Sequence, residues 1–229
     1  MEMRTVFFDG PGDQPQEPFA IPIPLSPECL RVLGCLIEKQ FLTPEVYPMS
    51  LNGVVTACNQ KTSREPVTAY DEALVDATLS QLQHLGLAQR IVGESHRVPK
   101  FRELFGEKTG LRVSEIASLC VMMLRGPQTA NEVKLRSNRM HEFGDEEDVM
   151  ATLRRLMERD PQPLVVCVGR QAGQREEWFM HLLGGPVDAN AVAPEPREVR
   201  TPLELQLADL RQRMEHLENQ FAEFRKQFE

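Results

Sequence analysis

The chain has 229 residues, of which 41% are hydrophobic, and a formal net charge of -8 at pH 7. This length predicts one or two domains, and the longest apolar run, Leu119 to Leu124, is too short to cross a bilayer, so we expect a cytoplasmic protein without a membrane span. A dedicated DNA-binding protein usually carries a basic face that neutralises phosphates, and this chain as a whole is acidic.

The N-terminal segment is rich in proline, which occurs at positions 11, 15, 18, 22 and 24. Proline fixes its own backbone torsion and moves the preceding residue out of the helical region. Residues 1–25 are therefore predicted to form an extended or disordered arm, to which no function is assigned.

A first domain is predicted over residues 26–104. Ser26, Ser50 and Asp71 are typical capping residues at the starts of three apolar-periodic helices, and Gly86 is typical of the end of the third. Two strand-like stretches follow and predict a hairpin, over residues 87–92 and 97–101. Three helices followed by a hairpin is the order of a winged-helix domain.

A second domain with the same order is predicted over residues 111–183. The block Val75-x-Ala77-Thr78-Leu79-x-x-Leu82 recurs as Val149-x-Ala151-Thr152-Leu153-x-x-Leu156, in each case within the third helix. Such a repeat indicates a duplicated supersecondary unit. The predicted fold class is therefore α+β, mainly α with small β-hairpins, arranged as two tandem winged-helix domains.

Residues 184–201 have the Gly, Pro and Ala content of a linker, and residues 202–229 are predicted to form an amphipathic helix. Apolar side chains in this helix are spaced alternately by four and three residues, which is the pattern of a coiled-coil seam. We expect the seam to pair two copies of the chain in a homodimer, and the pattern weakly favours a parallel arrangement of the two helices. The alternative is a helix that packs on its own domain. The seam residues are Leu203, Leu207, Leu210, Met214, Leu217, Phe221, Phe224 and Phe228.

One long motif resembles the YceH-like family of uncharacterised bacterial proteins. It reads Tyr47-Pro48-x-Ser50-x-Asn52-x-Val54-Val55-Thr56-Ala57-Cys58-Asn59-Gln60-Lys61-Thr62-x-Arg64-Glu65-Pro66-Val67, and Arg136-x-x-Arg139-Met140-x-Glu142-Phe143 and Met180-His181-Leu182 add to it. The resemblance covers about residues 26 to 184. It implies a tandem winged-helix architecture and leaves the biochemical role open.

No arrangement of residues predicts catalysis. The sequence contains no G-x-S-x-G, no P-loop and no dinucleotide-binding glycine motif, so we expect no enzyme and no cofactor. The five cysteines never form C-x-x-C and mostly lie in apolar segments, which is typical of small buried side chains. No metal site is predicted.

Candidate binding residues are the polar and basic side chains before the third helices and around the hairpins. They are suited to DNA phosphates, to bases or to the carboxylates of a protein partner, and the alternative for each is a solvated charged rim or a helix cap. The candidates are Asn59, Gln60, Lys61, Arg64, Arg97, Lys100, Lys134, Arg136, Arg139, Arg154 and Arg155.

Two hypotheses about function follow. The first is a DNA-associated, regulatory winged-helix dimer that binds double-stranded DNA through hairpins and pre-helix loops. The second is an adaptor that uses the same surfaces on a protein partner. The third helices begin with Asp71-Glu72 and with Asp145-Glu146-Glu147-Asp148, and these acidic starts argue against ordinary insertion into the major groove. Winged-helix architecture favours the first hypothesis, and we lean slightly toward it; electrostatics favours the second.

Overall fold

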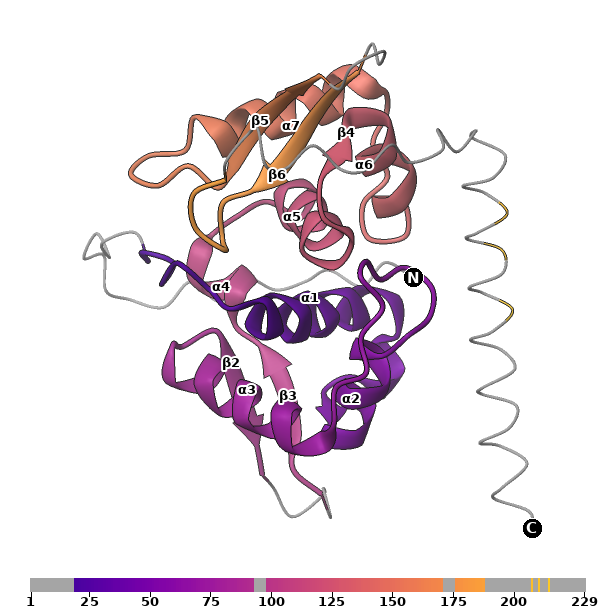
Figure 1. The fold of residues 1–229 in the computed structure, drawn as a ribbon, viewed down its shortest axis with the longest axis vertical. Coiled ribbons are helices and arrows are strands. Elements are labelled where there is room, and N and C mark those ends of the chain that lie inside the picture. The colour runs from indigo at the N-terminus through magenta and orange to yellow at the C-terminus, as the bar shows by residue number, and fades with distance from the viewer. Residues whose placement is uncertain are drawn as a thin grey trace, which may run out of the picture.

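The computed structural model describes residues 19–92, 98–170 and 176–187, together with Leu207, Leu210 and Met214. These residues form two halves that lie one above the other, each built from helices and one small antiparallel sheet (Figure 1). The predicted α+β class is confirmed. None of the helices in these ranges has the length and apolar character that a transmembrane span requires.

The first half contains three main helices and a three-stranded sheet. In the sheet, β3 lies between β1 and β2 and is antiparallel to both. The elements in chain order are α1 (Pro27–Leu42), the short 3-10 helix η1 (Pro44–Val46), β1 (Met49–Ser50), α2 (Leu51–Cys58), α3 (Glu72–His84), β2 (Ala88–Ile91) and β3 (Lys100–Glu103).

The second half repeats this order after a short connecting helix. Its sheet has β6 between β4 and β5, again antiparallel throughout. The elements are α4 (Phe105–Thr109), α5 (Val113–Arg125), β4 (Gln128–Thr129), α6 (Ala130–Ser137), α7 (Glu146–Met157), β5 (Val165–Arg170) and β6 (Glu177–His181). The sequence predicted two strands in each half, and the structure adds β1 and β4, which are too short to carry a periodic signal.

Local sequence explains where the helices begin. Side chains of Ser26, Ser50, Asp71, Thr129 and Asp145 each accept a hydrogen bond from a backbone N–H in the first turn of α1, α2, α3, α6 and α7. Such caps satisfy N–H groups that have no partner within the helix. The acidic residues Asp71 and Asp145 therefore have a structural role as the caps of α3 and α7.

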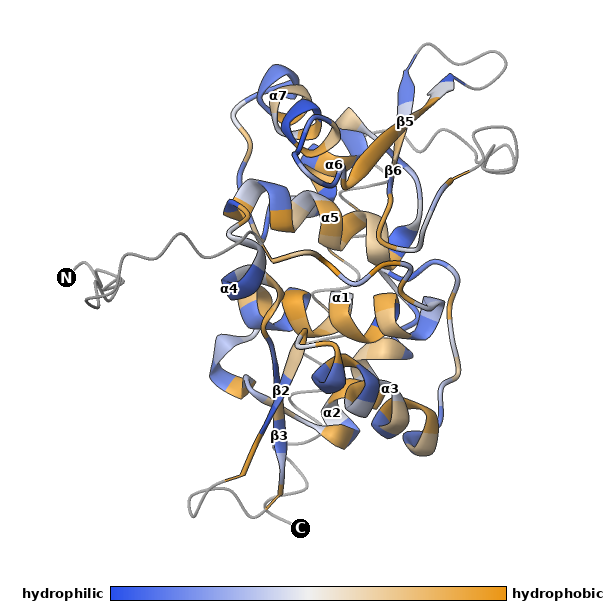
Figure 2. Cartoon of the chain, turned by 90° about the vertical axis from the view of Figure 1, so that its left-hand side faces the viewer, coloured by the Kyte–Doolittle hydropathy of each residue, from blue (hydrophilic) through white to orange (hydrophobic). Residues whose placement is uncertain are grey.

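The two halves share one hydrophobic core, which runs through the contact between α1 and α5 in the middle of the molecule (Figure 2). Gly34 permits this contact, because a Cβ atom there would lie 2.9 Å from Leu124 Cδ2. The Cys120 thiol donates to the Gly34 carbonyl oxygen at 3.3 Å across the same contact. The halves are therefore packed together as one body.

The repeated sequence block supplies equivalent parts of this core. Val75, Leu79 and Leu82 in α3 and Val149, Leu153 and Leu156 in α7 are all fully buried. Burial of these side chains removes apolar area from water, which stabilises the folded state by about 25 cal/mol for each Å² of apolar area buried. The repeat thus reflects core packing in both halves.

Residues 1–25 were predicted to be an extended or disordered arm, and the described residues 19–25 are extended but packed against the protein. Ile21 and Leu25 are buried, and the Gln162 side-chain amide makes two hydrogen bonds to the Ile21 backbone, each 3.2 Å long. The Leu25 N–H donates to the Leu183 carbonyl oxygen at 2.8 Å. The prolines prevent a helix here, but they do not prevent an extended segment from burying the apolar residues between them. Residues 1–18 and 188–200 lie outside the described residues.

Candidate interaction site

The segment between α2 and α3, residues 59–71, carries four of the candidate residues and is folded back on itself. The Asn59 side chain joins its two ends, because Nδ2 donates to the Tyr70 carbonyl oxygen at 2.7 Å and Oδ1 accepts from the Tyr70 N–H at 2.8 Å. Thr68 Oγ1 donates to the Cys58 carbonyl oxygen at 3.0 Å. Asn59 therefore closes a loop, as the alternative interpretation of this residue predicted.

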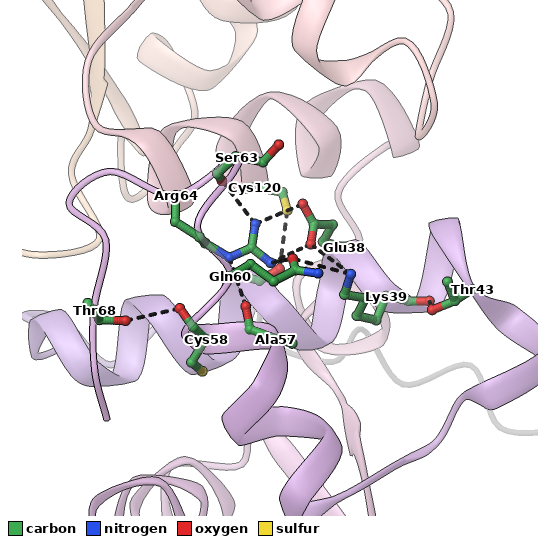
Figure 3. A network of polar contacts seen from close by, with 11 residues as sticks. Glu38, Lys39, Thr43, Ala57, Cys58, Gln60, Ser63, Arg64, Thr68 and Cys120 are labelled. Carbon is green, nitrogen blue, oxygen red and sulfur yellow. Dashed lines mark hydrogen bonds and ion pairs between the residues drawn. The ribbon is translucent and has the colours of Figure 1, made fainter. Parts of the chain in front are cut away.

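Arg64 lies at the centre of the buried polar network in Figure 3. Its guanidinium forms a two-pronged ion pair with Glu38 of α1, with Nη1 to Oε1 at 3.0 Å and Nη2 to Oε2 at 2.5 Å. Nε donates to the Ala57 carbonyl oxygen at 3.0 Å, and Nη2 also donates to Gln60 Oε1 at 2.9 Å. The Arg64 side chain has no exposed surface, so it is not placed to contact DNA or a partner.

The ion pair determines the charge of the buried carboxyl group. Burial alone would raise the pKa of Glu38, but attraction and hydrogen bonds from Arg64, aided by Lys39, lower it to about 2. Glu38 is therefore an anion at neutral pH inside the protein, a state that is stable only when the charge is paired.

The same segment connects the two halves. The Glu65 N–H donates to the Leu124 carbonyl oxygen of α5 at 2.8 Å, and Arg31 Nη2 of α1 donates to the Pro66 carbonyl oxygen at 2.6 Å. The motif that carries the family resemblance therefore builds the junction between the halves. The sequence analysis did not single out Glu38. The signal that could have found it is a carboxylate in a helix whose neighbouring residues are mostly apolar.

Most candidate cations of the second half are bonded within the protein. Arg136 pairs with Glu132 at 2.8 Å and also donates to Gln128 Oε1. Lys134 Nζ donates to the Gly144 carbonyl oxygen at 2.9 Å, and Arg155 pairs with Glu115 at 3.0 Å. Arg139 and Arg154 are exposed and, among the described segments, have no side-chain partner.

In the first half, Lys61 is exposed and Lys100 is half-buried on β3, where it pairs in register with Ser50 and Ile91. Arg97 lies outside the described residues. Thus the structure joins Gln60 and Arg64 in one network, Asn59 closes the neighbouring loop, and the remaining described candidates are distributed over separate elements of both halves.

The outer face of α3 differs from a typical phosphate-binding surface. The helix contains no Lys or Arg, and its exposed positions include Asp71 at the cap, Glu72, Asp76 and Leu74, which is 39% exposed. The first turn of α7 likewise carries Glu146 and its acidic neighbours. Within the described ranges, no group of three His, Cys, Asp or Glu side chains is arranged to hold a metal ion.

The C-terminal seam is only partly described. Leu207, Leu210 and Met214 are helical and at least half exposed. Leu203, Leu217, Phe221, Phe224 and Phe228 lie outside the described residues.

Comparison with known proteins gives the family. The model of a family described as "Protein of unknown function, DUF480" matches residues 25–174. A UPF0502 protein of Pelobacter propionicus (strain DSM 2379 / NBRC 103807 / OttBd1) is 50% identical over 161 residues, covering 70% of this chain and 73% of the relative. The chain belongs to the UPF0502 (YceH) family.

Other members of the UPF0502 family match over longer stretches. The protein of Opitutus terrae (strain DSM 11246 / JCM 15787 / PB90-1) is 46% identical over 196 residues, covering 85% of this chain and 83% of the relative. The protein YceH of Salmonella paratyphi B (strain ATCC BAA-1250 / SPB7) is 41% identical over 203 residues, covering 87% and 92%. The resemblance drawn from the long motif is confirmed.

Proposed function

We propose that this UPF0502 protein is a non-enzymatic tandem winged-helix protein that acts as an interaction adaptor. The order helix, short strand, helix, helix and two strands, with the third strand in the middle of the sheet, occurs in both halves and supports the winged-helix interpretation. In this interpretation α3 and α7 occupy the positions of recognition helices, and the β2–β3 and β5–β6 hairpins are the wings.

The observation that carries the adaptor proposal is the outer face of α3. A recognition helix that enters the major groove needs cations or neutral donors near phosphates, whereas α3 contains no Lys or Arg and exposes Glu72 and Asp76 along one edge, with Leu74 exposed at the other edge. A helix face that exposes carboxylates together with an apolar side chain is suited to a protein partner with a complementary basic and apolar surface.

Charge reversal on α3 tests the adaptor proposal. We expect a partner that co-purifies with the full chain at stoichiometric yield to be lost from a Glu72→Lys/Asp76→Lys variant. Glu158→Lys, at an exposed position after α7, is the matched control and should retain the partner. Equal recovery with the α3 variant and the control would refute a docking role for α3.

DNA association is the second candidate, and a specific observation favours it. Lys61, Arg90, Lys100, Arg139 and Arg154 have no side-chain partner among the described residues, and Arg90 and Lys100 lie on the strands of the first wing. Cations of this kind bind phosphate without reading sequence.

Electrophoretic retardation of mixed-sequence duplex DNA separates the two candidates. The adaptor proposal expects no retardation at low salt. The DNA candidate replaces the adaptor proposal if the chain retards DNA and its affinity falls steeply with salt. In that case Lys61→Ala and Lys100→Ala should each reduce the slope of log affinity against log salt concentration by about one unit.

The proposal includes a homodimer formed by the C-terminal seam. The exposed positions of Leu207, Leu210 and Met214 support it, because an apolar helical face in water is stabilised by a second copy. Light scattering on a Leu207→Glu/Leu210→Glu variant should give half the mass of the unmodified chain. An unchanged mass would reject the seam as the dimer contact.

A further inference from the structure

Residues 19–25, which we call the strap, lie directly before α1 and are bonded to the second half of the molecule. Within the described residues, three hydrogen bonds hold the strap there. Two join Ile21 to the Gln162 side chain, each 3.2 Å long, and one runs from the Leu25 N–H to the Leu183 carbonyl oxygen at 2.8 Å. Ile21 and Leu25 are the buried side chains of the strap. The strap is therefore attached at two places, and its residues belong to no helix or strand.

His181, at the end of β6, lies beside the last residue of the strap. A Cβ atom on Gly184 would lie 3.9 Å from the Leu25 carbonyl oxygen and 4.0 Å from His181 Cε1. The same position is 3.3 Å from Leu30 Cδ1, so the strap, α1 and β6 meet here. The His181 side chain is buried, and within the described residues its Nδ1 atom has no hydrogen-bond partner. A neutral imidazole can remain in this place, whereas an imidazolium would be a charge without water or a counter-ion.

No described carboxylate is placed to compensate a proton on His181. Burial is the main cause that lowers its pKa to about 4, and no neighbouring charge of either sign contributes. The elements packed against this end of β6 are β4, β5, α5 and α6, together with Leu30 of α1. The carboxylates on these elements and on β6 are Glu28, Glu38, Glu115, Glu132 and Glu177, and none of them acts on His181. A proton on His181 therefore requires that water reach the imidazole.

We propose that the strap detaches from the second half when His181 takes up a proton. The strap is the neighbouring element that opens with the least loss of contact, because β6 lies in the centre of its sheet and is hydrogen-bonded to β4 and β5. Detachment lets water reach His181 and breaks only three hydrogen bonds. The acid form thus exposes the apolar side chains of Ile21 and Leu25, which the neutral form buries. This change does not depend on the adaptor proposal.

Amide hydrogen exchange of the full chain tests the proposal at the Leu25 N–H. Its protection, corrected for the intrinsic pH dependence of exchange, gives the opening constant of the strap. Histidine has a pKa of about 6.5 in the open form and about 4 in the closed form, so the opening constant should rise about a hundredfold from about pH 7 to about pH 4.

Two histidine variants show which residue takes up the proton. The opening constant of His181→Met should rise by less than about threefold over the same pH range. His84→Gln, at an exposed position of α3, is the matched control and should keep the full rise. A rise below about tenfold in the unmodified chain, or an equal rise in His181→Met, would overturn the proposal.

Gln162→Ala keeps His181 and identifies the element that moves. This substitution removes two of the three hydrogen bonds of the strap, so the opening constant should be at least about fivefold larger at pH 7 and should keep its dependence on pH. An unchanged opening constant would show that the Leu25 N–H exchanges through another motion, and the strap would be rejected as the moving element.

Urea separates detachment of the strap from unfolding of the whole second half. The Leu164 N–H, which donates to the Leu156 carbonyl oxygen at 2.9 Å, reports the larger event. Detachment exposes little surface, so below the unfolding transition the opening constant at Leu25 should change much less with urea than that at Leu164. Equal urea dependence at the two amides would mean that acid unfolds the half as a unit, which contradicts the proposal.

Discussion

The two halves of the molecule have the same order of elements but different connections between their second and third helices. In the first half, residues 59–71 form a long segment that carries Arg64 into the interior and reaches α5. In the second half, the shorter connection between α6 and α7 exposes Asn138, Arg139 and Asp145. The repeated core positions remain equivalent, whereas the connecting loops differ in role. A basic residue before a third helix is therefore not by itself a sign of an external ligand.

The largest effect is expected from breaking the buried ion pair of the first half. Arg64→Ala leaves the Glu38 carboxylate buried without its main partner and should reduce the free energy of unfolding by about 3 to 5 kcal/mol. Urea denaturation measures this difference. Arg139→Ala removes the corresponding exposed cation of the second half and should change stability by about 0.5 kcal/mol or less. Similar effects of the two substitutions would remove the distinction between the connections.

The shared core is tested by matched substitutions in the repeated block. Leu79→Ala and Leu153→Ala each create a cavity and should each cost about 2 to 5 kcal/mol. The only tryptophan, Trp178, lies in the second half and reports unfolding there by fluorescence. Because the halves share one core, Leu79→Ala in the first half should lower the Trp178 transition as much as Leu153→Ala does.

Independent halves would give a different result for the same pair of variants. If Leu79→Ala leaves the fluorescence transition in place and shifts only the far-ultraviolet circular dichroism, the halves unfold separately and the common core has no energetic consequence.

A buried histidine makes the second half sensitive to acid. His181 on β6 is 3% exposed, and burial lowers its pKa to about 4. Histidine in the unfolded chain titrates near a pKa of about 6.5, so between these values the unfolded chain binds a proton that the folded protein does not. Stability should therefore be complete above about pH 6.5 and decrease by about 3 kcal/mol as the pH falls to about 4.

The His181 contribution is isolated by comparing variants across the same pH range. The decrease in unfolding free energy between about pH 6.5 and 4 should be smaller by about 3 kcal/mol in His181→Met. His84→Gln, at an exposed position of α3, should retain the dependence of the unmodified chain. An identical pH dependence in His181→Met would contradict the assignment.

The smallest effects are expected at the equivalent helix caps. Ser50 Oγ accepts from the Gly53 N–H at 3.2 Å, and Thr129 Oγ1 accepts from the Glu132 N–H at 3.3 Å. Ser50→Ala and Thr129→Ala should each reduce the unfolding free energy by about 1 kcal/mol in urea denaturation. A much larger loss at one of the two positions would show that the halves do not use these caps equivalently.

Much of the fold was predictable from local patterns. Apolar periodicity and capping residues located the helices α1, α2 and α3, and the repeated block located α7, because those signals act within a few residues of the chain. Burial of residues 19–25 was not predictable, because it depends on Gln162 and Leu183, which are far away in sequence. The candidate site was predicted only in part: Gln60 and Arg64 do lie together, but Arg64 faces Glu38 and the interior.

The sequence by itself determined the family, the α+β class and the repeat, since each rests on residue types at fixed local spacing. Only the tertiary structure decided which charges are paired. Whether Arg64 faces solvent or Glu38 depends on how α1 and α5 pack across Gly34. A charge in a sequence has no fixed partner, because ion pairs form between side chains that folding brings within a few ångströms of each other.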